Sequence, residues 1–92
     1  MITSFRHKGL EKFFLTGGKA GIQPRHAERL RELLTALHAA LSLEDLERPS
    51  WRLHPLKGDK IDHWAMTVQA NWRLVFRFDG QHVELLDYLD YH

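Results

Sequence analysis

The sequence predicts an α+β fold in which two N-terminal helices pack on one face of a small antiparallel sheet. Apolar residues recur at helical spacing in the first half of the chain, and after Pro49 the spacing changes to the alternation of strands. Asp79-Gly80, between two alternating runs, is a hairpin signal. Helices followed by neighbouring strands are typical of the α+β class. With 92 residues, 43% of them hydrophobic, we expect one domain over residues 1–92 with one core.

Two helices are expected in the first half of the chain. Apolar residues at helical spacing, ended by Gly17-Gly18, predict a helix over residues 8–16, preceded by a short edge strand at residues 2–5. Pro24 is well placed to begin a second helix. The apolar face of that helix should run for about five turns and consist of Ala27, Leu30, Leu33, Leu34, Leu37 and Leu41. The opposite, charged face should be solvated, and Ser42 with Asp45 predicts a cap for one more turn at residues 43–46.

Strands are expected after Pro49. Trp51 and Leu53 should begin a short strand, followed by a loop at residues 54–60. Three further strands are predicted at about residues 64–68, 72–78 and 82–88 by their alternation. In the second of these, one face is wholly apolar and should pack on the helices together with the tryptophans, whereas the other face bears Arg73 and Arg77. We expect this second face to be free to carry a site.

Composition and charge exclude several classes of protein. The chain has no cysteine, which excludes disulfide bonds and thiolate metal sites. No segment has the pattern of a signal peptide or the length of a membrane span, so we expect a soluble, cytoplasmic protein without membrane contact. A formal charge of +1 does not by itself indicate a nucleic-acid-binding protein. The charges do segregate, however, with acids concentrated in residues 28–47 and a basic run at residues 48–60.

The chain ends on Asp90-Tyr91-His92, directly after an apolar run, where proton-transferring side chains are unexpected in a structural tail. With the histidine and lysine of the predicted loop and the first arginine of the strand, the candidate set is His54, Lys57, Arg73, Asp90, Tyr91 and His92. These residue types could cleave RNA without a metal. The ribose 2′-hydroxyl must lose a proton, cations must stabilise the phosphorane, and the departing 5′-oxygen must gain a proton.

The residues alone leave other interpretations open. His54 could simply fill a loop, and Arg77 could either follow an RNA backbone or pair with Glu84 across the hairpin. The remaining histidines are expected to be scattered surface residues: His7, His26, His38, His63 and His82. No HExxH motif or comparable ligand spacing occurs, so a zinc site is disfavoured and no cofactor is expected.

Four motifs, in order over nearly the whole chain, resemble the HigB branch of the RelE-like toxins of bacterial type II toxin–antitoxin systems. The motifs are RHKGLEKFF, HPLKGD, ANWRLVFRF and the terminal DYH. The resemblance implies a RelE-like microbial RNase fold with a curved, mainly antiparallel sheet. It also implies a metal-independent endoribonuclease that cuts translated mRNA in the A site of the small ribosomal subunit. The implied inhibitor is a HigA-like helix-turn-helix antitoxin.

The resemblance also implies roles for individual residues. His54 and His92 would divide the two proton transfers, with base and acid left unassigned. Lys57 and Arg73 would stabilise the transition-state charge. At the tail, Asp90 would orient a histidine or the C-terminal segment, and Tyr91 would position the substrate. Two alternatives remain: a catalytically silent RelE-like module that binds the ribosome or its antitoxin, and a metal-using hydrolase built on the histidines.

Overall fold

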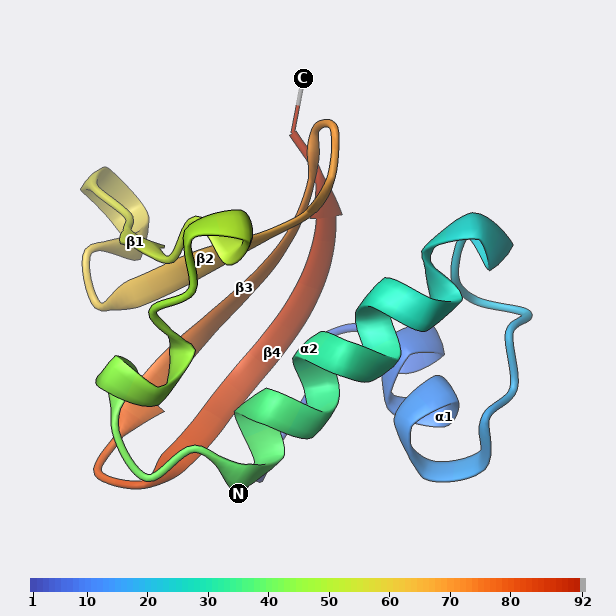
Figure 1. Ribbon diagram of the computed structural model, residues 1–92, viewed down its shortest axis with the longest axis horizontal. Helices are drawn as coiled ribbons and strands as arrows, with labels where there is room; N and C mark the ends of the chain where they lie inside the picture. The colour runs from blue at the N-terminus through green and yellow to red at the C-terminus, as the bar shows by residue number, and fades with distance from the viewer. Residues whose placement is uncertain (92) are drawn as a thin grey trace.

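The computed structural model describes residues 1–91 and contains two α-helices and a four-stranded antiparallel sheet (Figure 1). The helices are α1 (Lys8–Thr16) and α2 (Ala27–Ala39). The strands lie in the sheet in chain order: β1 (His54–Pro55), β2 (His63–Gln69), β3 (Trp72–Asp79) and β4 (His82–Asp90). Figure 1 shows α2 lying across β4, with α1 beside α2. The predicted α+β class and antiparallel sheet are confirmed.

Helix α1 has the bounds that the sequence predicts because both of its ends are capped. The Nδ1 atom of His7 accepts a hydrogen bond from the backbone N–H of Leu10, at 2.9 Å. At the other end Gly17 adopts a left-handed conformation (φ 79°), and its N–H donates to the Phe13 carbonyl at 2.8 Å. Glycine takes this conformation at little cost, which is why the helix stops there.

Helix α2 is shorter than predicted. It is preceded by the 3₁₀ turn Pro24–His26 and ends at Ala39, since Ala40 is already extended (φ −64°, ψ 133°). Leu41 therefore lies outside the helix and is 66% exposed, so its predicted place on the apolar face is wrong. The cause is Asp45, whose carboxylate accepts hydrogen bonds from the two N–H groups of residues 41 and 42. This carboxylate draws the chain into the predicted next turn, Leu43–Leu46.

The strand predicted to begin at Trp51 is wrong. Residues Pro49–Trp51 form a 3₁₀ turn, and the indole is buried, with Nε1 donating to the Glu32 carboxylate at 2.9 Å. Proline at the first position favours such a turn, and the indole packs inward instead of alternating along a strand. After Arg52, which is left-handed (φ 50°), the chain enters β1. His54 thus begins a short strand, where a loop was predicted.

The hairpin between β3 and β4 turns one residue later than predicted. Asp79 is paired with His82, so the two-residue loop is Gly80 and Gln81, with Gly80 at φ 63°. Strand β4 carries a bulge where Leu85 has a positive φ of 54° and the register shifts. The predicted N-terminal edge strand is reduced to two isolated parallel bridges from residues 2 and 5 to β4.

The main core lies between the helices and the inward face of the sheet. Leu30, Leu33 and Leu37 of α2 are fully buried there with Phe76 of β3. As predicted, the three tryptophans pack at this core, Trp51 buried and the other two partly buried. The opposite face is not free throughout, because Ala65 and Val75 on it are also buried. None of the helices within residues 1–91 has the length and apolar character to cross a membrane.

Candidate functional site

An open pocket of about 320 Å³ lies between the loop after β1 and the end of β4. Lys57 and Tyr91, both predicted as site residues, line it together with Leu56, Asp59 and Lys60. Two ammonium groups and a phenol thus border one concave surface. The structure therefore brings together one residue of the loop and one of the tail, which are 34 positions apart in the sequence.

His54 is held at the start of β1 by its own strand pairing and by one side-chain hydrogen bond. Its Cα is paired with that of Ala65 in β2, and its ring is exposed. The Nδ1 atom lies 2.7 Å from the Arg52 carbonyl oxygen. Because a carbonyl oxygen can only accept, Nδ1 carries the proton of this bond, so in the neutral ring Nε2 is the nitrogen that can accept one. The ring is therefore presented as a base.

Arg73 and Arg77 both lie on the sheet face opposite the helices. The Nη1 atom of Arg73 donates to the carbonyl oxygens of Ala70 and Trp72, the latter at 3.1 Å, which ties the guanidinium to the β2–β3 turn. Arg77 is exposed and lies opposite Glu84 in the sheet register. No ion pair joins these two residues, since the one salt bridge within residues 1–91 is between residues 29 and 32 of α2.

The tail residues point in different directions. Asp90 is opposite Trp72 in the register, which places it on the helix side of the sheet. Burial lowers the pKa of His26 and raises that of Tyr88, and the negative charge of Asp90 acts in the raising direction on both groups, which lie on that side. Tyr91, by contrast, lines the pocket with Lys57, and its N–H donates to the Asn71 carbonyl at 2.8 Å. His92, the predicted second proton-transfer group, lies outside the described residues.

The prediction that the other five histidines are scattered surface residues is wrong for His26, which is 1% exposed. Its position was readable from the sequence, because residues 26, 30, 33 and 37 follow helical spacing on the buried face. His63 is also unlike a surface residue, since both of its ring nitrogens are buried without a hydrogen-bond partner in residues 1–91. Two more make specific bonds, His7 as the α1 cap and His38 as acceptor of the residue 2 N–H. His82 alone is plainly exposed.

Positive charge gathers where β2 begins, beside the loop that carries Lys57. The pKa of His63 is lowered, first by burial and then by the charges of Lys60, Arg6 and Arg77, with Asp62 acting in the opposite direction. A neutral histidine is thus surrounded mainly by cations. Three cations and one carboxylate act on this ring, and such an excess of positive charge can attract a phosphate backbone.

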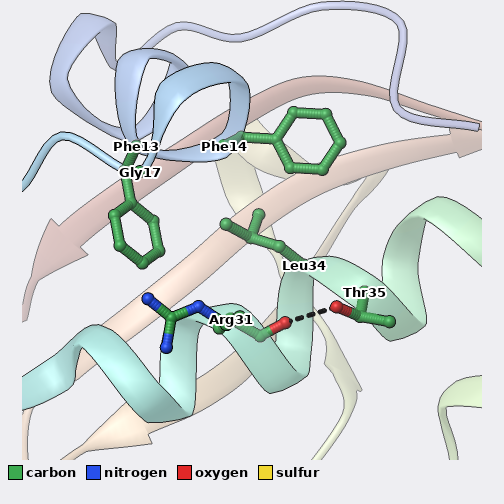
Figure 2. Close-up of a pocket in the computed structure, with 6 residues that line it drawn as sticks. All are labelled: Phe13, Phe14, Gly17, Arg31, Leu34 and Thr35. Carbon is green, nitrogen blue, oxygen red and sulfur yellow. Dashed lines mark hydrogen bonds between the residues drawn. The ribbon is translucent and has the colours of Figure 1, made fainter.

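A second pocket, of about 240 Å³, lies between the two helices, far from any predicted site residue in the sequence (Figure 2). Its lining is Phe13, Phe14, Gly17, Arg31, Leu34 and Thr35. The Thr35 hydroxyl already donates to the Arg31 carbonyl at 2.7 Å, and the Arg31 guanidinium lies 5.6 Å from the centre of the Phe13 ring. No group in this lining transfers protons near neutral pH, so it is not a reaction site.

Comparison with known proteins identifies the family. The model of the HigB-like toxin family, described as "RelE-like toxin of type II toxin-antitoxin system HigB", matches residues 3–92. The chain belongs to this family. The resemblance that the four motifs predict is thereby confirmed. Among curated proteins, the HigB-like chain is similar to the "Endoribonuclease HigB" of Proteus vulgaris, with 41% identity over 92 residues and full coverage of both chains.

Solved structures share the fold of this HigB-like toxin at low sequence identity. A chain of the "YoeB-YefM complex from Staphylococcus aureus" is 18% identical, with a TM-score of 0.64 and coverage of 100% of this chain and 95% of that one. The YoeB/ParE toxin from Agrobacterium tumefaciens is also 18% identical, with a TM-score of 0.62 and coverage of 99% and 98%. These likenesses extend to the fold alone. Within residues 1–91, no three His, Asp or Glu side chains are grouped closely enough to hold a metal ion.

Proposed function

We propose that this HigB-like toxin is an endoribonuclease that cleaves translated mRNA in the A site of the ribosome by metal-independent acid–base chemistry. The observation that carries the proposal is the pocket that Lys57 and Tyr91 share, beside a strand that presents the His54 ring. It is supported by the 41% identity, over its full length, to a protein named Endoribonuclease HigB. That same identity makes the catalytically silent alternative the weaker one.

The proposed reaction is an attack of the ribose 2′-oxygen on the adjacent phosphorus, with departure of the 5′-oxygen. His54 takes the 2′-hydroxyl proton at Nε2, an assignment supported by the hydrogen bond that places the other ring proton on Nδ1. His92 then gives a proton to the 5′-oxygen. The products are a 2′,3′-cyclic or 3′-phosphate and a 5′-hydroxyl end.

Cations and the tail complete the proposed site. Lys57 stabilises the charge of the phosphorane from the pocket, and Arg73 contributes guanidinium donors that its bonds to the turn leave unused. Tyr91 positions a nucleotide by stacking or through its hydroxyl. Arg77 binds the RNA backbone further along the strand, next to the positive charge around His63.

The proposed partners follow from the family and the reaction. A toxin of a type II system is held inactive by its antitoxin, which we propose is a HigA-like helix-turn-helix protein. The Staphylococcus aureus relative was solved in complex with its partner YefM. The ribosome and its message are the other partners, which places the protein in the cytoplasm.

The test compares a message under translation with the same message as naked RNA, each incubated with the purified toxin. We expect cuts only in the translated message, equally well in EDTA. Cleavage of both RNAs alike would overturn the dependence on the ribosome, and loss of cleavage in EDTA would favour the metal-using hydrolase. His54→Ala should reduce the cuts by about 10²-fold to 10⁴-fold. The matched control His82→Ala, at an exposed histidine, should leave them unchanged.

A further inference from the structure

His26 is the one polar side chain that residues 1–91 bury almost completely. It ends the 3₁₀ turn that leads into α2, and its Nδ1 atom lies 2.6 Å from the Tyr88 hydroxyl oxygen. The same oxygen accepts a hydrogen bond from the Gln23 N–H at 3.4 Å. The hydroxyl can donate its proton to Nδ1 or accept a second bond from an Nδ1–H group, and in either direction the bond joins Tyr88 to His26. Strand β4 is thereby fastened to the start of α2.

The His26 ring also contacts the two strands at their ends. It meets the Trp72 ring edge-on, with centroids 5.5 Å apart, and the Tyr88 ring at 6.0 Å. The Trp72 and Tyr88 rings are themselves 4.5 Å apart. Because alternate residues of a strand share a face, Tyr88 and Asp90 both point toward this cluster, Asp90 opposite Trp72 in the register. The imidazole thus lies where β3 begins and β4 ends.

The Asp90 carboxylate acts electrostatically on the same two groups. Burial is the largest influence on His26 and lowers its pKa, while the Gln69 side chain and the Asp90 charge act in the opposite direction. For Tyr88, burial raises the pKa, and the Asp90 charge adds to that effect. The carboxylate predicted to orient a histidine therefore lies within electrostatic reach of a buried one that the sequence did not single out.

We propose that His26 is a positioning residue that holds the C-terminal end of β4, and through it Asp90 and Tyr91, in the geometry of the RNA-cleaving site. The inference rests on the proposed endoribonuclease function. His26 itself is too deeply buried to touch RNA, since 1% of it is exposed. Its anchor, the Tyr88 hydroxyl, belongs to the residue three positions before Tyr91. A short, ordered path therefore links the anchor to the pocket, and small displacements of reacting groups reduce rates steeply.

Two substitutions of His26 separate positioning from simple packing. His26→Asn keeps a hydrogen-bonding group near the place of Nδ1 but leaves a cavity, whereas His26→Leu fills more of the space and cannot form a hydrogen bond. If His26 only packs the core, His26→Leu should impair both stability and cleavage less than His26→Asn does. If it positions the tail, His26→Asn should reduce the rate of cleavage less than His26→Leu does, even though the His26→Asn protein is less stable.

The measurement is cleavage of a defined message on programmed ribosomes by the full-length toxin, with kcat and KM determined separately. We expect His26→Leu to lower kcat by roughly tenfold to a hundredfold with KM nearly unchanged, and His26→Asn to recover part of that loss. Tyr88→Phe, which removes only one oxygen atom, should lower kcat in the same way. In the double variant with His26→Leu, it should add little, because both changes break one bond.

The control is Leu46→Ala, a buried residue of the turn that follows the other end of α2. This variant should lose stability but keep kcat at temperatures where it is folded. If a His26 variant does not fold, Tyr88→Phe alone decides the outcome. If the wild type cleaves RNA but Tyr88→Phe leaves kcat unchanged, the role of His26 is overturned and the proposed function stays intact. The same holds if kcat is higher in His26→Leu than in His26→Asn. No cleavage by the wild type would overturn both.

Discussion

The two sides of the sheet differ in how far their polar groups are paired within the chain. On the helix side, Nδ1 of His26 and the hydroxyl of Tyr88 are paired in a buried aromatic cluster, while Nε2 of the same ring is buried without a hydrogen-bond partner in residues 1–91. On the other side, Lys57 makes no hydrogen bond or ion pair with another side chain of residues 1–91 and borders an open pocket. The contacts of the helix side, or closed side, are formed without a ligand, and the open side keeps the charge of Lys57 available for an anion. A buried anchor therefore lies behind a surface on which Lys57 is available to a partner, while His54 and Arg73 each bond a backbone carbonyl nearby.

The largest expected effect is on the open side. His54→Ala removes the proposed base and should reduce the rate of cleavage by about 10²-fold to 10⁴-fold. Its stability should hardly change, because the ring is exposed and, among residues 1–91, is bonded only to the Arg52 carbonyl. Cleavage kinetics and thermal melts of the purified variant check both expectations. A large fall in melting temperature would show that His54 stabilises the fold, and it would contradict the difference between the open and closed sides of the sheet.

Next in size is a loss of stability on the closed side. Phe76 is fully buried in β3, so Phe76→Ala should lower the free energy of unfolding by about 3–5 kcal/mol, the cost of such a cavity. Urea unfolding followed by tryptophan fluorescence measures it. Replacing exposed Tyr91 by alanine is the comparison on the open side and should cost far less stability while impairing cleavage. Equal losses of stability would contradict the division between the two sides.

A smaller effect is expected from acid. Burial lowers the pKa values of His26 and His63. The unfolded chain therefore takes up protons at pH values where these folded rings stay neutral. Stability is then fully present above the unfolded histidine pKa of about 6.5 and falls as the pH drops toward the lowered folded values. The urea midpoint at pH 7.5 and at pH 5.5 should show this loss.

Variants isolate the contribution of the two histidines to that pH dependence. His26→Leu should flatten it in part, since one of the two protons is no longer taken up on unfolding. Exposed His82→Ala serves as the matched control and should keep the wild-type slope. A His26→Leu variant with the full wild-type slope would contradict the assignment.

The smallest expected effect concerns one helix end. A Cβ atom added at Gly17 meets no other atom within 4 Å, so the cost of Gly17→Ala is that of the left-handed backbone (φ 79°) alone. We expect a loss of about 1 kcal/mol in the free energy of unfolding, with cleavage unchanged. A change in cleavage would couple α1 to the site and weaken the separation of anchor and pocket.

The sequence predicted the elements whose ends are fixed by local chemistry. The bounds of α1 follow from Gly17, and the β3–β4 hairpin follows from Asp79-Gly80 to within one residue. The prediction of secondary structure was wrong where a contact with another part of the chain determines the local conformation. Trp51 does not begin a strand, because its indole turns inward and donates a hydrogen bond to Glu32 of α2. The residues near Trp51 in the sequence do not predict this distant partner. Leu41 left its helix because Asp45 competes for the backbone N–H groups.

The candidate site was predictable in part for the same reason. Motifs located the residue types, and the pocket that joins Lys57 with Tyr91 agrees with a shared role for the loop and the tail. Alternation along β4 also places Asp90 on the side opposite to Arg73, which the motifs alone did not reveal. The burial of His26 was not predicted, because this histidine was interpreted as a surface residue although its helical spacing matches that of the core residues.

One measurement tests the central claim most directly: the chemical ends of the RNA that the toxin cuts on programmed ribosomes in the presence of EDTA. Acid–base cleavage by the 2′-hydroxyl predicts a 2′,3′-cyclic or 3′-phosphate on one fragment and a 5′-hydroxyl on the other, and a large reduction in these products with His54→Ala. A 5′-phosphate end, or cutting that continues undiminished in His54→Ala, would contradict the mechanism proposed for this site.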